Sequence, residues 1–119
     1  MLNIILWIDD IRDTKIFRKS CADRSNERVI WCKSVNDAIR AYTLWGSVFE
    51  DPDIQLVEID LDHDAGDFVS DGGDYVKFLD WMELCHPNDF SKIAWKIHTM
   101  NPVGAQNMRA ILRRNGVNC

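Results

Sequence analysis

The sequence predicts a small α/β domain in which helices cover both faces of a parallel β-sheet. Segments of strand type alternate along the chain with segments that have helical periodicity. The strand segments are apolar at nearly every position, as in strands buried on both faces, instead of alternating apolar with polar residues. Together these observations predict a doubly wound, three-layer sandwich of about four parallel strands with right-handed connections.

Length and composition indicate a single domain over residues 1–119. The 119 residues allow one core and leave no room for a second domain. Hydrophobic residues make up 46% and charged residues 28%, which is ordinary for a soluble globular protein. The longest apolar run near the start is too short to span a membrane, and it lacks the basic start of a signal peptide. We therefore expect an intracellular, cytoplasmic protein with no membrane partner.

The charges are unevenly distributed along the chain. The net charge of −5 argues against a general nucleic-acid coat protein, which is usually basic. Ile54–Val76 holds seven acidic residues and no Lys or Arg, whereas Ser91–Cys119 holds five basic residues and no acid. One half could bind a cation while the other attracts an anionic substrate. The alternative is that Arg109, Arg113 and Arg114 simply form the solvated face of a helix.

The cysteines and tryptophans indicate free thiols and core packing. No two of the four cysteines form a CxxC pair, so free thiols are favoured over zinc ligands: Cys21, Cys32, Cys85 and Cys119. All five tryptophans lie in apolar, patterned segments, which favours a place in the core over a platform for stacking bases: Trp7, Trp31, Trp45, Trp81 and Trp95.

The first strand is predicted over Asn3–Ile8, an apolar run that ends at Asp9 and Asp10. Ile11–Cys21 has a mixed pattern that could contain a short helix. Arg28–Cys32 then reads as the second strand.

Ser34 predicts the start of the first clear helix. A serine suits the N-cap position, and Asp37 three residues on suits an acidic capping partner. Apolar residues at helical spacing carry the helix to about Trp45, and Gly46 is placed to stop it.

A turn at Asp51-Pro52-Asp53 precedes the third strand, which is predicted over Ile54–Leu61. Ala65–Gly73 is rich in glycine and aspartate and reads as a loop. Tyr75–Cys85 has helical periodicity and is ended by His86-Pro87-Asn88.

The fourth strand is predicted over Ile93–His98. Asn101 with Pro102 behind it reads as an N-cap followed by the first helical residue. The helix continues over Val103–Arg114, and Gly116 is placed to terminate it. No fifth strand is evident.

The most polar short stretches of the chain follow three of the predicted strands. In a doubly wound sheet the site lies at the carboxyl ends of the strands, so these residues should gather in one crevice. They are Asp9, Asp10 and Arg12 after the first strand, Asp60, Asp62, His63 and Asp64 after the third, and His98, Thr99 and Asn101 after the fourth.

Four or more converging carboxylates predict a divalent cation, because like charges packed together are unfavourable until something neutralises them. An oxygen-rich ligand set favours Mg²⁺ or Mn²⁺, although the imidazoles leave a transition metal open. Arg12 has the planar fork that suits phosphate oxygens, and a helix that starts near Pro102 offers backbone N–H groups to an anion. Cation, arginine and helix end together describe a phosphate site.

Each of these residues also has a structural alternative. Asp9 and Asp10 could cap the next segment, and His98 could be a core histidine bonded to backbone. The D-x-D-x-D spacing from Asp60 matches the start of an EF-hand calcium loop, but the sixth position is Ala65 and the twelfth is Asp71.

Two aspartates after the first strand and one after the third resemble the receiver domains of bacterial response regulators. Those domains have a flavodoxin-like fold and end in a fifth strand with a lysine, which is not evident here. Three ordered motifs resemble the cyclic-phosphate-processing receiver-like family more closely. Asp9–Arg12 reads D-D-x-R, Leu61–Gly66 reads L-D-H-D-x-G, and His98–Gly104 reads H-T-x-N-P-x-G.

The resemblance implies a receiver-like fold and a metal-dependent phosphoesterase that acts on a cyclic nucleotide or an RNA end bearing a 2′,3′-cyclic phosphate. We expect Asp9, Asp10 and Asp62 (or Asp64) to hold Mg²⁺ or Mn²⁺. His63 and His98 would act as general acid and base in an order left open. The predicted substrate contacts are Arg12, Thr99, Asn101 and Gly104.

Two questions stay open at this point. Either Asp60 or Asp62 could take the place of the receiver's phosphoryl acceptor. The chain could also be a non-catalytic module that binds a metal and a phosphorylated ligand, or that accepts a phosphoryl group on aspartate and signals through a partner protein.

Overall fold

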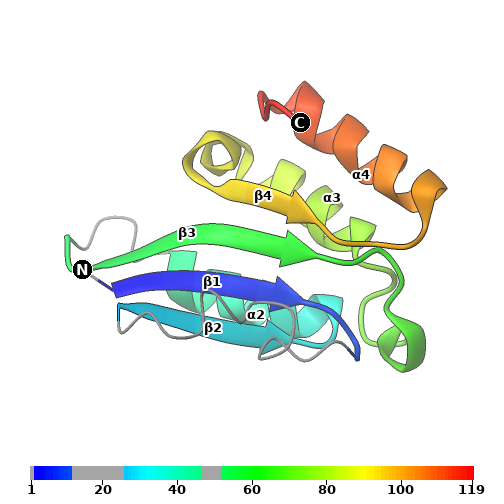
Figure 1. Cartoon of the computed structure of the whole chain (residues 1–119), viewed down its shortest axis with the longest axis horizontal. Helices are drawn as coiled ribbons and strands as arrows, with labels where there is room; N and C mark the ends of the chain where they lie inside the picture. Colours follow the sequence, from blue (N-terminus) through cyan, green and yellow to red (C-terminus); the bar gives the residue numbers. More distant parts are fainter. Residues whose placement is uncertain (1, 12–25, 47–51) are drawn as a thin grey trace.

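A computed structural model of the chain describes residues 2–11, 26–46 and 52–119. Four parallel strands form one sheet in the order β2-β1-β3-β4, as Figure 1 shows. The strands are β1 (Leu2–Ile8), β2 (Glu27–Cys32), β3 (Ile54–Leu61) and β4 (Ala94–Ile97). The predicted α/β class with four parallel strands is confirmed, and the predicted strand ends are shifted by no more than a residue.

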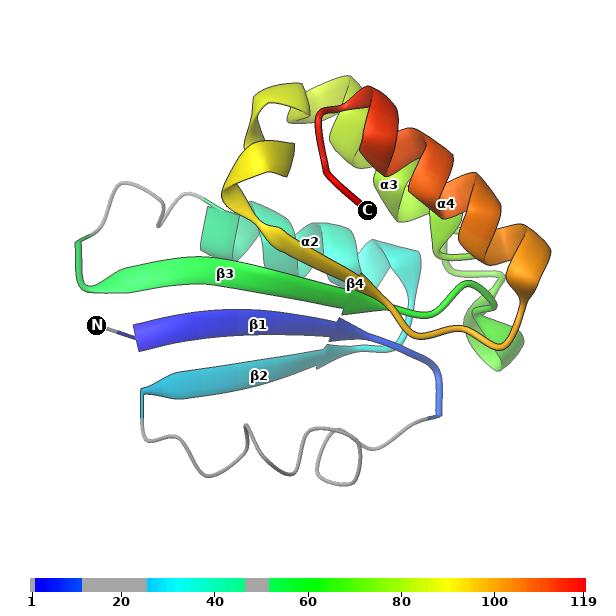
Figure 2. The same ribbon diagram turned by 45° about the horizontal axis from the view of Figure 1, so that its top comes forward.

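Three α-helices form a layer beside the sheet, with α3 packed between α2 and α4 (Figure 2). They are α2 (Val35–Gly46), α3 (Val76–Cys85) and α4 (Pro102–Arg114). Two 3₁₀ turns, η2 (Gly66–Phe68) and η3 (Pro87–Lys92), flank α3. The short helix predicted within Ile11–Cys21 lies, apart from its first residue, outside the described residues.

Side-chain caps start α2 and α4 where the sequence predicted them. Ser34 Oγ accepts a hydrogen bond from the Asp37 backbone N–H at 3.0 Å. Asn101 Oδ1 accepts one from the Gly104 backbone N–H at 2.9 Å, with Pro102 as the first helical residue. The Asp37 carboxylate is not a reciprocal cap, because it binds the Arg40 guanidinium one turn further along α2.

Both faces of β1 are buried, as its continuous apolar run predicted. Ile4, Leu6 and Ile8 belong to the main core, with β3 and the three helices. Ile5 and Trp7 alternate with them and so point to the opposite face of the sheet, yet they are only 1% and 4% exposed. This double burial accounts for the uninterrupted hydrophobicity of the strand.

Backbone pairing continues just beyond the strands and draws their carboxyl ends together. The N–H of Asp9 donates to the Cys32 carbonyl (3.1 Å), and that of Asp62 donates to Ile8 (2.9 Å). The N–H of His98 donates to the Leu61 carbonyl at 3.0 Å. The residues that follow β1, β3 and β4 therefore start from one edge of the sheet.

The loop between β3 and α3 is fastened to the start of α2. Asp71 accepts hydrogen bonds from Ser34 Oγ (2.6 Å) and from Asn36 Nδ2 (3.0 Å). Its carbonyl also accepts the Asn36 backbone N–H at 3.1 Å. These bonds hold the loop at the carboxyl edge of the sheet.

β4 forms the end of the sheet, and the described residues after α4 contain no fifth strand. None of the helices described for this chain combines the length and apolar character needed to cross a membrane.

Candidate functional site

Asp9, Asp10 and Asp62 form a carboxylate cluster at the carboxyl edge of the sheet. One carboxylate oxygen of each lies within 4.8 Å of the corresponding atoms of the other two. Asp9 is fully buried and Asp62 is 7% exposed, whereas Asp10 is half-buried. The sequence predicted Asp9 and Asp10 together with Asp62 or Asp64, and the structure brings Asp62 to this pair.

The cluster has the donor chemistry of a site for a hard divalent cation. Burial raises the pKa of Asp10, and the neighbouring charges of Asp9 and Asp62 raise it further. A cation would relieve this repulsion, and three carboxylates suit Mg²⁺ or Mn²⁺. The residues present therefore fit the metal that the sequence led us to expect.

Gly66 leaves the space that Asp10 occupies. The backbone of Gly66 has a φ of +55°, and a Cβ atom there would overlap Asp10 Oδ2. A glycine at this position therefore meets both a conformational and a steric requirement.

Asp9 is held by hydrogen bonds on all sides. Its Oδ1 accepts the Ile11 backbone N–H at 3.0 Å, and its Oδ2 lies 2.8 Å from His98 Nε2. The indole N–H of Trp31 donates to the Asp9 carbonyl at 2.7 Å. These hydrogen bonds fix the orientation of the buried Asp9 side chain within the cluster.

His98 follows β4, far from Asp9 in the sequence, yet its side chain contacts the cluster. Its ring stacks on Trp7 with the ring centroids 4.2 Å apart and the planes 9° from parallel. The side chain is 22% exposed, and its Nε2 lies 2.8 Å from the Asp9 carboxylate. The contact with Asp9 places His98 at the carboxylate cluster.

A second group lies on the same edge and contains His63, Asp64 and Asp74, with one ligand atom of each within 4.8 Å of the others. His63 Nδ1 lies 2.7 Å from Asp64 Oδ1. This hydrogen bond is the main reason why the pKa of Asp64 is lowered. Of the two residues left open as third ligand, Asp62 joins Asp9 and Asp10, whereas Asp64 joins His63.

The turn before α4 packs against His63. Asn101 Nδ2 lies 3.4 Å from both Asp64 Oδ1 and His63 Nδ1. Thr99 Oγ1 accepts the Asn101 backbone N–H at 3.1 Å and so shapes the turn. A Cβ atom on Gly104 would lie 2.8 Å from His63 Nδ1, so this glycine makes room for the imidazole.

Asp60 stands apart from these two groups. It lies within β3, in register with Trp7 on one side and Lys96 on the other, and it is 3% exposed. Asp62 therefore takes the position beside Asp9 and Asp10. Because Asp60 belongs to a strand, it does not begin an EF-hand loop.

Two further predictions concern basic residues. Arg12, expected to contact the phosphate, lies outside the described residues. Arg114 binds Glu83 through Nε at 2.6 Å, and Arg113 is exposed with its Nε on the Cys119 carbonyl. These contacts agree with the alternative of a solvated helix face.

Trp31 is a site residue that the sequence analysis missed, because it was assigned to the core. It is 37% exposed, its N–H binds the Asp9 carbonyl, and Lys33 Nζ lies 4.8 Å from the ring centroid. Trp31 is the next-to-last residue of β2, close to the carboxyl edge of the sheet. This position near the end of a predicted strand was the available signal. The other tryptophans are buried or half-buried, as predicted.

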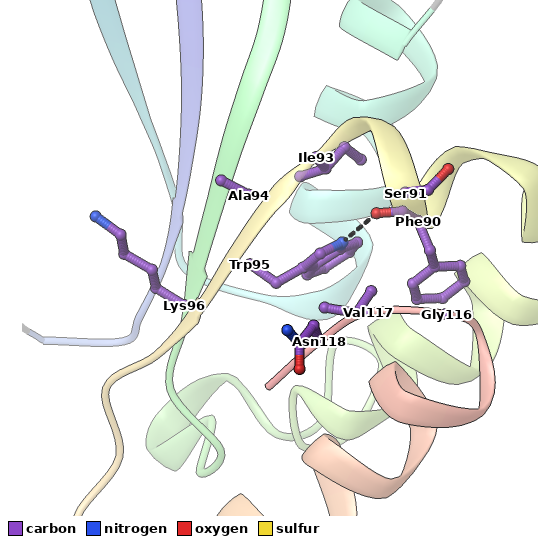
Figure 3. A pocket seen from close by; sticks show the side chains of 9 residues that line it. All are labelled: Phe90, Ser91, Ile93, Ala94, Trp95, Lys96, Gly116, Val117 and Asn118. Atoms are coloured by element: carbon purple, nitrogen blue, oxygen red, sulfur yellow. Dashed lines mark hydrogen bonds between the residues drawn. The ribbon is translucent and has the colours of Figure 1, made fainter.

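A groove of about 360 Å³ lies elsewhere, beside β4 and the C-terminal segment (Figure 3). The indole of Trp95 faces it, with the indole N–H bonded to the Phe90 carbonyl at 3.0 Å. None of the predicted site residues lines this groove. The site at the carboxyl edge is therefore separate from it.

The parallel four-stranded sheet and its helices define a receiver-like α/β domain, with a cluster of three aspartates at the carboxyl ends of the strands. The chain belongs to the cyclic-phosphate processing receiver domain family, whose model matches residues 4–114. No curated protein and no solved structure matches the chain.

Proposed function

We propose that this protein is a metal-dependent phosphoesterase that opens a cyclic phosphate, such as a 2′,3′-cyclic RNA end or a cyclic nucleotide. The observation that carries the proposal is the meeting of Asp9, Asp10 and Asp62 at one edge. His63 and His98 lie at that same edge, which combines acidic ligands with imidazoles. Membership in a cyclic-phosphate processing family supports the choice of substrate class.

Asp9, Asp10 and Asp62 would hold Mg²⁺ or Mn²⁺ through carboxylate oxygens. When bound, such an ion supplies charge stabilisation at a phosphoryl oxygen and lowers the pKa of a bound water. The raised pKa of Asp10, caused by burial and its acidic neighbours, is consistent with a place where a cation belongs.

In the proposed reaction His63 would move a proton. Its Nδ1 faces the Asp64 carboxylate at 2.7 Å, so the Nδ1–H donates and Nε2 remains the basic nitrogen. In the proposed reaction Nε2 takes a proton from water as the water oxygen bonds to phosphorus. The bond from phosphorus to one ring oxygen breaks, that oxygen ends with a proton, and the product is a phosphomonoester.

The start of α4 is suited to the negative charge of the substrate. Its N-terminus carries backbone N–H groups and the positive end of the helix dipole, and Asn101 and Thr99 hold this turn beside His63. The phosphate clamp assigned to Arg12 is part of the same proposal.

Turnover by the purified chain tests the proposal. The substrates are 2′,3′-cyclic nucleotides, 3′,5′-cyclic nucleotides, cyclic dinucleotides and an RNA oligonucleotide with a 2′,3′-cyclic end, each with Mg²⁺ or Mn²⁺. We expect a phosphomonoester from at least one, abolished by EDTA. Asp62→Asn should lower the rate on the order of 100-fold or more. Asp67→Asn, an exposed acid outside both carboxylate groups, is the matched control.

Binding without turnover would contradict the enzymatic proposal. Tight stoichiometric binding of a cyclic nucleotide with no product favours the non-catalytic binding module. Incorporation of label from acetyl phosphate into Asp62 favours the module that accepts a phosphoryl group, for which the position of Asp62 beside Asp9 and Asp10 is the supporting observation.

A further inference from the structure

We infer that His98 is a positioning residue that orients Asp9 for metal binding, and that it does not exchange a proton with the substrate. The inference deepens the proposed function, because it rests on Asp9 as a metal ligand. It separates the roles of the two histidines, which the sequence placed together as acid and base.

Four hydrogen bonds constrain Asp9 within the carboxylate cluster. Its backbone N–H donates to Cys32 at 3.1 Å, and its carbonyl accepts from Trp31 at 2.7 Å. One carboxylate oxygen accepts from the Ile11 N–H at 3.0 Å, and the other lies 2.8 Å from His98 Nε2. A carboxylate oxygen keeps a second lone pair, so these bonds fix the orientation of Asp9 and still permit coordination.

The contacts of the two ring nitrogens of His98 argue against proton exchange with a substrate. Nε2 is engaged with Asp9 Oδ2, and Nδ1 is buried. The ring is held flat on Trp7 at 4.2 Å, and the backbone N–H of His98 is bonded to the Leu61 carbonyl at 3.0 Å. Proton exchange with a substrate would require the ring to leave both Asp9 and Trp7.

His63 has the opposite arrangement. Its carboxylate partner is Asp64, which belongs to the second group and not to the Asp9, Asp10 and Asp62 cluster. The bond uses Nδ1, so Nε2 keeps its lone pair. The proposed proton transfer therefore falls to His63 alone.

The role of His98 follows from the chemistry of ligand support. A carboxylate ligand is usually oriented by a hydrogen-bond donor outside the coordination sphere, and removal of such a donor costs about 10- to 100-fold in metal affinity. An amide N–H can supply the same hydrogen bond, but an amide cannot carry a proton between groups. Glutamine at position 98 therefore distinguishes positioning from proton transfer.

The experiment measures Mn²⁺ affinity by electron paramagnetic resonance on the wild-type chain, His98→Ala and His98→Gln, and then measures turnover at saturating Mn²⁺. We expect His98→Ala to bind Mn²⁺ about 10- to 100-fold more weakly, and His98→Gln to recover most of the affinity and most of the turnover. His86→Gln is the control, since His86 lies after α3 beside Asp89 and away from the site.

The opposite result would be unchanged Mn²⁺ affinity in both variants with turnover reduced on the order of 100- to 10,000-fold in both, which assigns proton transfer to His98 and overturns the inference. If the wild-type chain binds Mn²⁺ but turns over no substrate, the proposed function fails, and the affinity series still decides the inference. If the wild-type chain binds no Mn²⁺, both fail.

Trp31→Phe provides a second variant in case His98→Ala does not fold. It keeps an aromatic ring at a partly exposed position and removes the N–H that binds the Asp9 carbonyl. We expect weaker Mn²⁺ binding with a normal circular dichroism spectrum. Unchanged affinity in Trp31→Phe and in His98→Gln, with turnover lost only in His98→Gln, would overturn the inference.

Discussion

The imidazole of His63 lies against the first turn of α4 at Gly104, where a Cβ atom would come within 2.8 Å of His63 Nδ1 and closer still to the ring carbons. The ring and the helix can approach this closely only because residue 104 has no side chain. Gly104 was predicted to contact the substrate, but its visible contact is with His63.

Gly104→Ala is therefore expected to displace His63 and to reduce turnover about 100-fold, the usual scale for a shift of about 1 Å in a reacting group. Mn²⁺ affinity should be unchanged, because the Asp9, Asp10 and Asp62 cluster does not include this turn. Steady-state kinetics and Mn²⁺ titration check both points. Gln106→Ala, at an exposed position of α4, is the control, and full turnover in Gly104→Ala would show that His63 moves without cost.

Asp10→Asn should make the protein more stable in EDTA and less responsive to Mg²⁺. The pKa of Asp10 is raised by burial and by Asp9 and Asp62, so its ionised form costs stability at neutral pH, and that cost disappears as the pH falls through the raised pKa. We expect a gain of up to about 1 kcal/mol in EDTA at pH 7.

Thermal denaturation with EDTA and with Mg²⁺ provides the measurement for Asp10→Asn. Mg²⁺ should raise the melting temperature of the wild-type chain more than that of the variant, because a ligand stabilises the state that binds it. Asp67→Asn should respond as the wild-type chain does. An equal Mg²⁺ response in Asp10→Asn would argue against Asp10 as a ligand.

Ser34→Ala should destabilise the protein by about 1–2 kcal/mol, because it removes both an N-cap and a buried hydrogen bond. Ser34 is fully buried, and its Oγ joins the Asp37 N–H to the Asp71 carboxylate. Urea denaturation measures the change, and Ser91→Ala at an exposed position is the control. A change no larger than that of the control would mean that water replaces the hydroxyl.

Glu83→Gln should lower stability at neutral pH but not in strong acid. Hydrogen bonds from Arg114 and Asn115 lower the pKa of Glu83 to about 2, below its ordinary value of 4.5. A lowered carboxyl pKa contributes stability above pH 4.5 that is lost as the pH falls toward about 2. The contribution is small because the pair is exposed.

The pH dependence of the melting temperature, measured for Glu83→Gln and for the wild-type chain, checks this. The two curves should converge between pH 4.5 and about pH 2. Asp80→Asn on the same helix is the control. A constant separation at all pH values would mean that the ion pair is not the source of the difference.

Much of the fold follows from local patterns in the sequence. β3 has the bounds predicted for it, because the turn-forming sequence Asp51-Pro52-Asp53 precedes its apolar run and aspartates follow it. The starts of α2 and α4 were predicted from Ser34 and from Asn101 with Pro102, since a cap is a contact between residues only a few positions apart. The 3₁₀ turn η3 was not predicted, because Pro87 marked only the end of a helix.

The residues of the candidate site could be named from the sequence, but the choice between Asp62 and Asp64 as the neighbour of Asp9 and Asp10 could not be made. Asp60 lies inside β3, whereas Asp62 follows its last residue, so the difference between them depends on where the strand ends. The choice between Asp62 and Asp64 depends on how the following loop folds back toward α3. Trp31 was misassigned because hydrophobicity alone does not report that a ring lies beside the site.

Hydrophobic periodicity and caps act over neighbouring residues, so local patterns were enough to predict the α/β class, the strand segments and the edge at which the polar residues collect. The contacts between residues at that edge depend on how the whole chain packs. Asp9 and His98 are 89 positions apart in the sequence. Their contact depends on the strand order, which brings the carboxyl ends of the parallel strands β1 and β4 to the same edge of the sheet. Strand order is a property of the whole packed chain, so no local pattern could have predicted that His98 contacts Asp9 while His63 contacts Asp64.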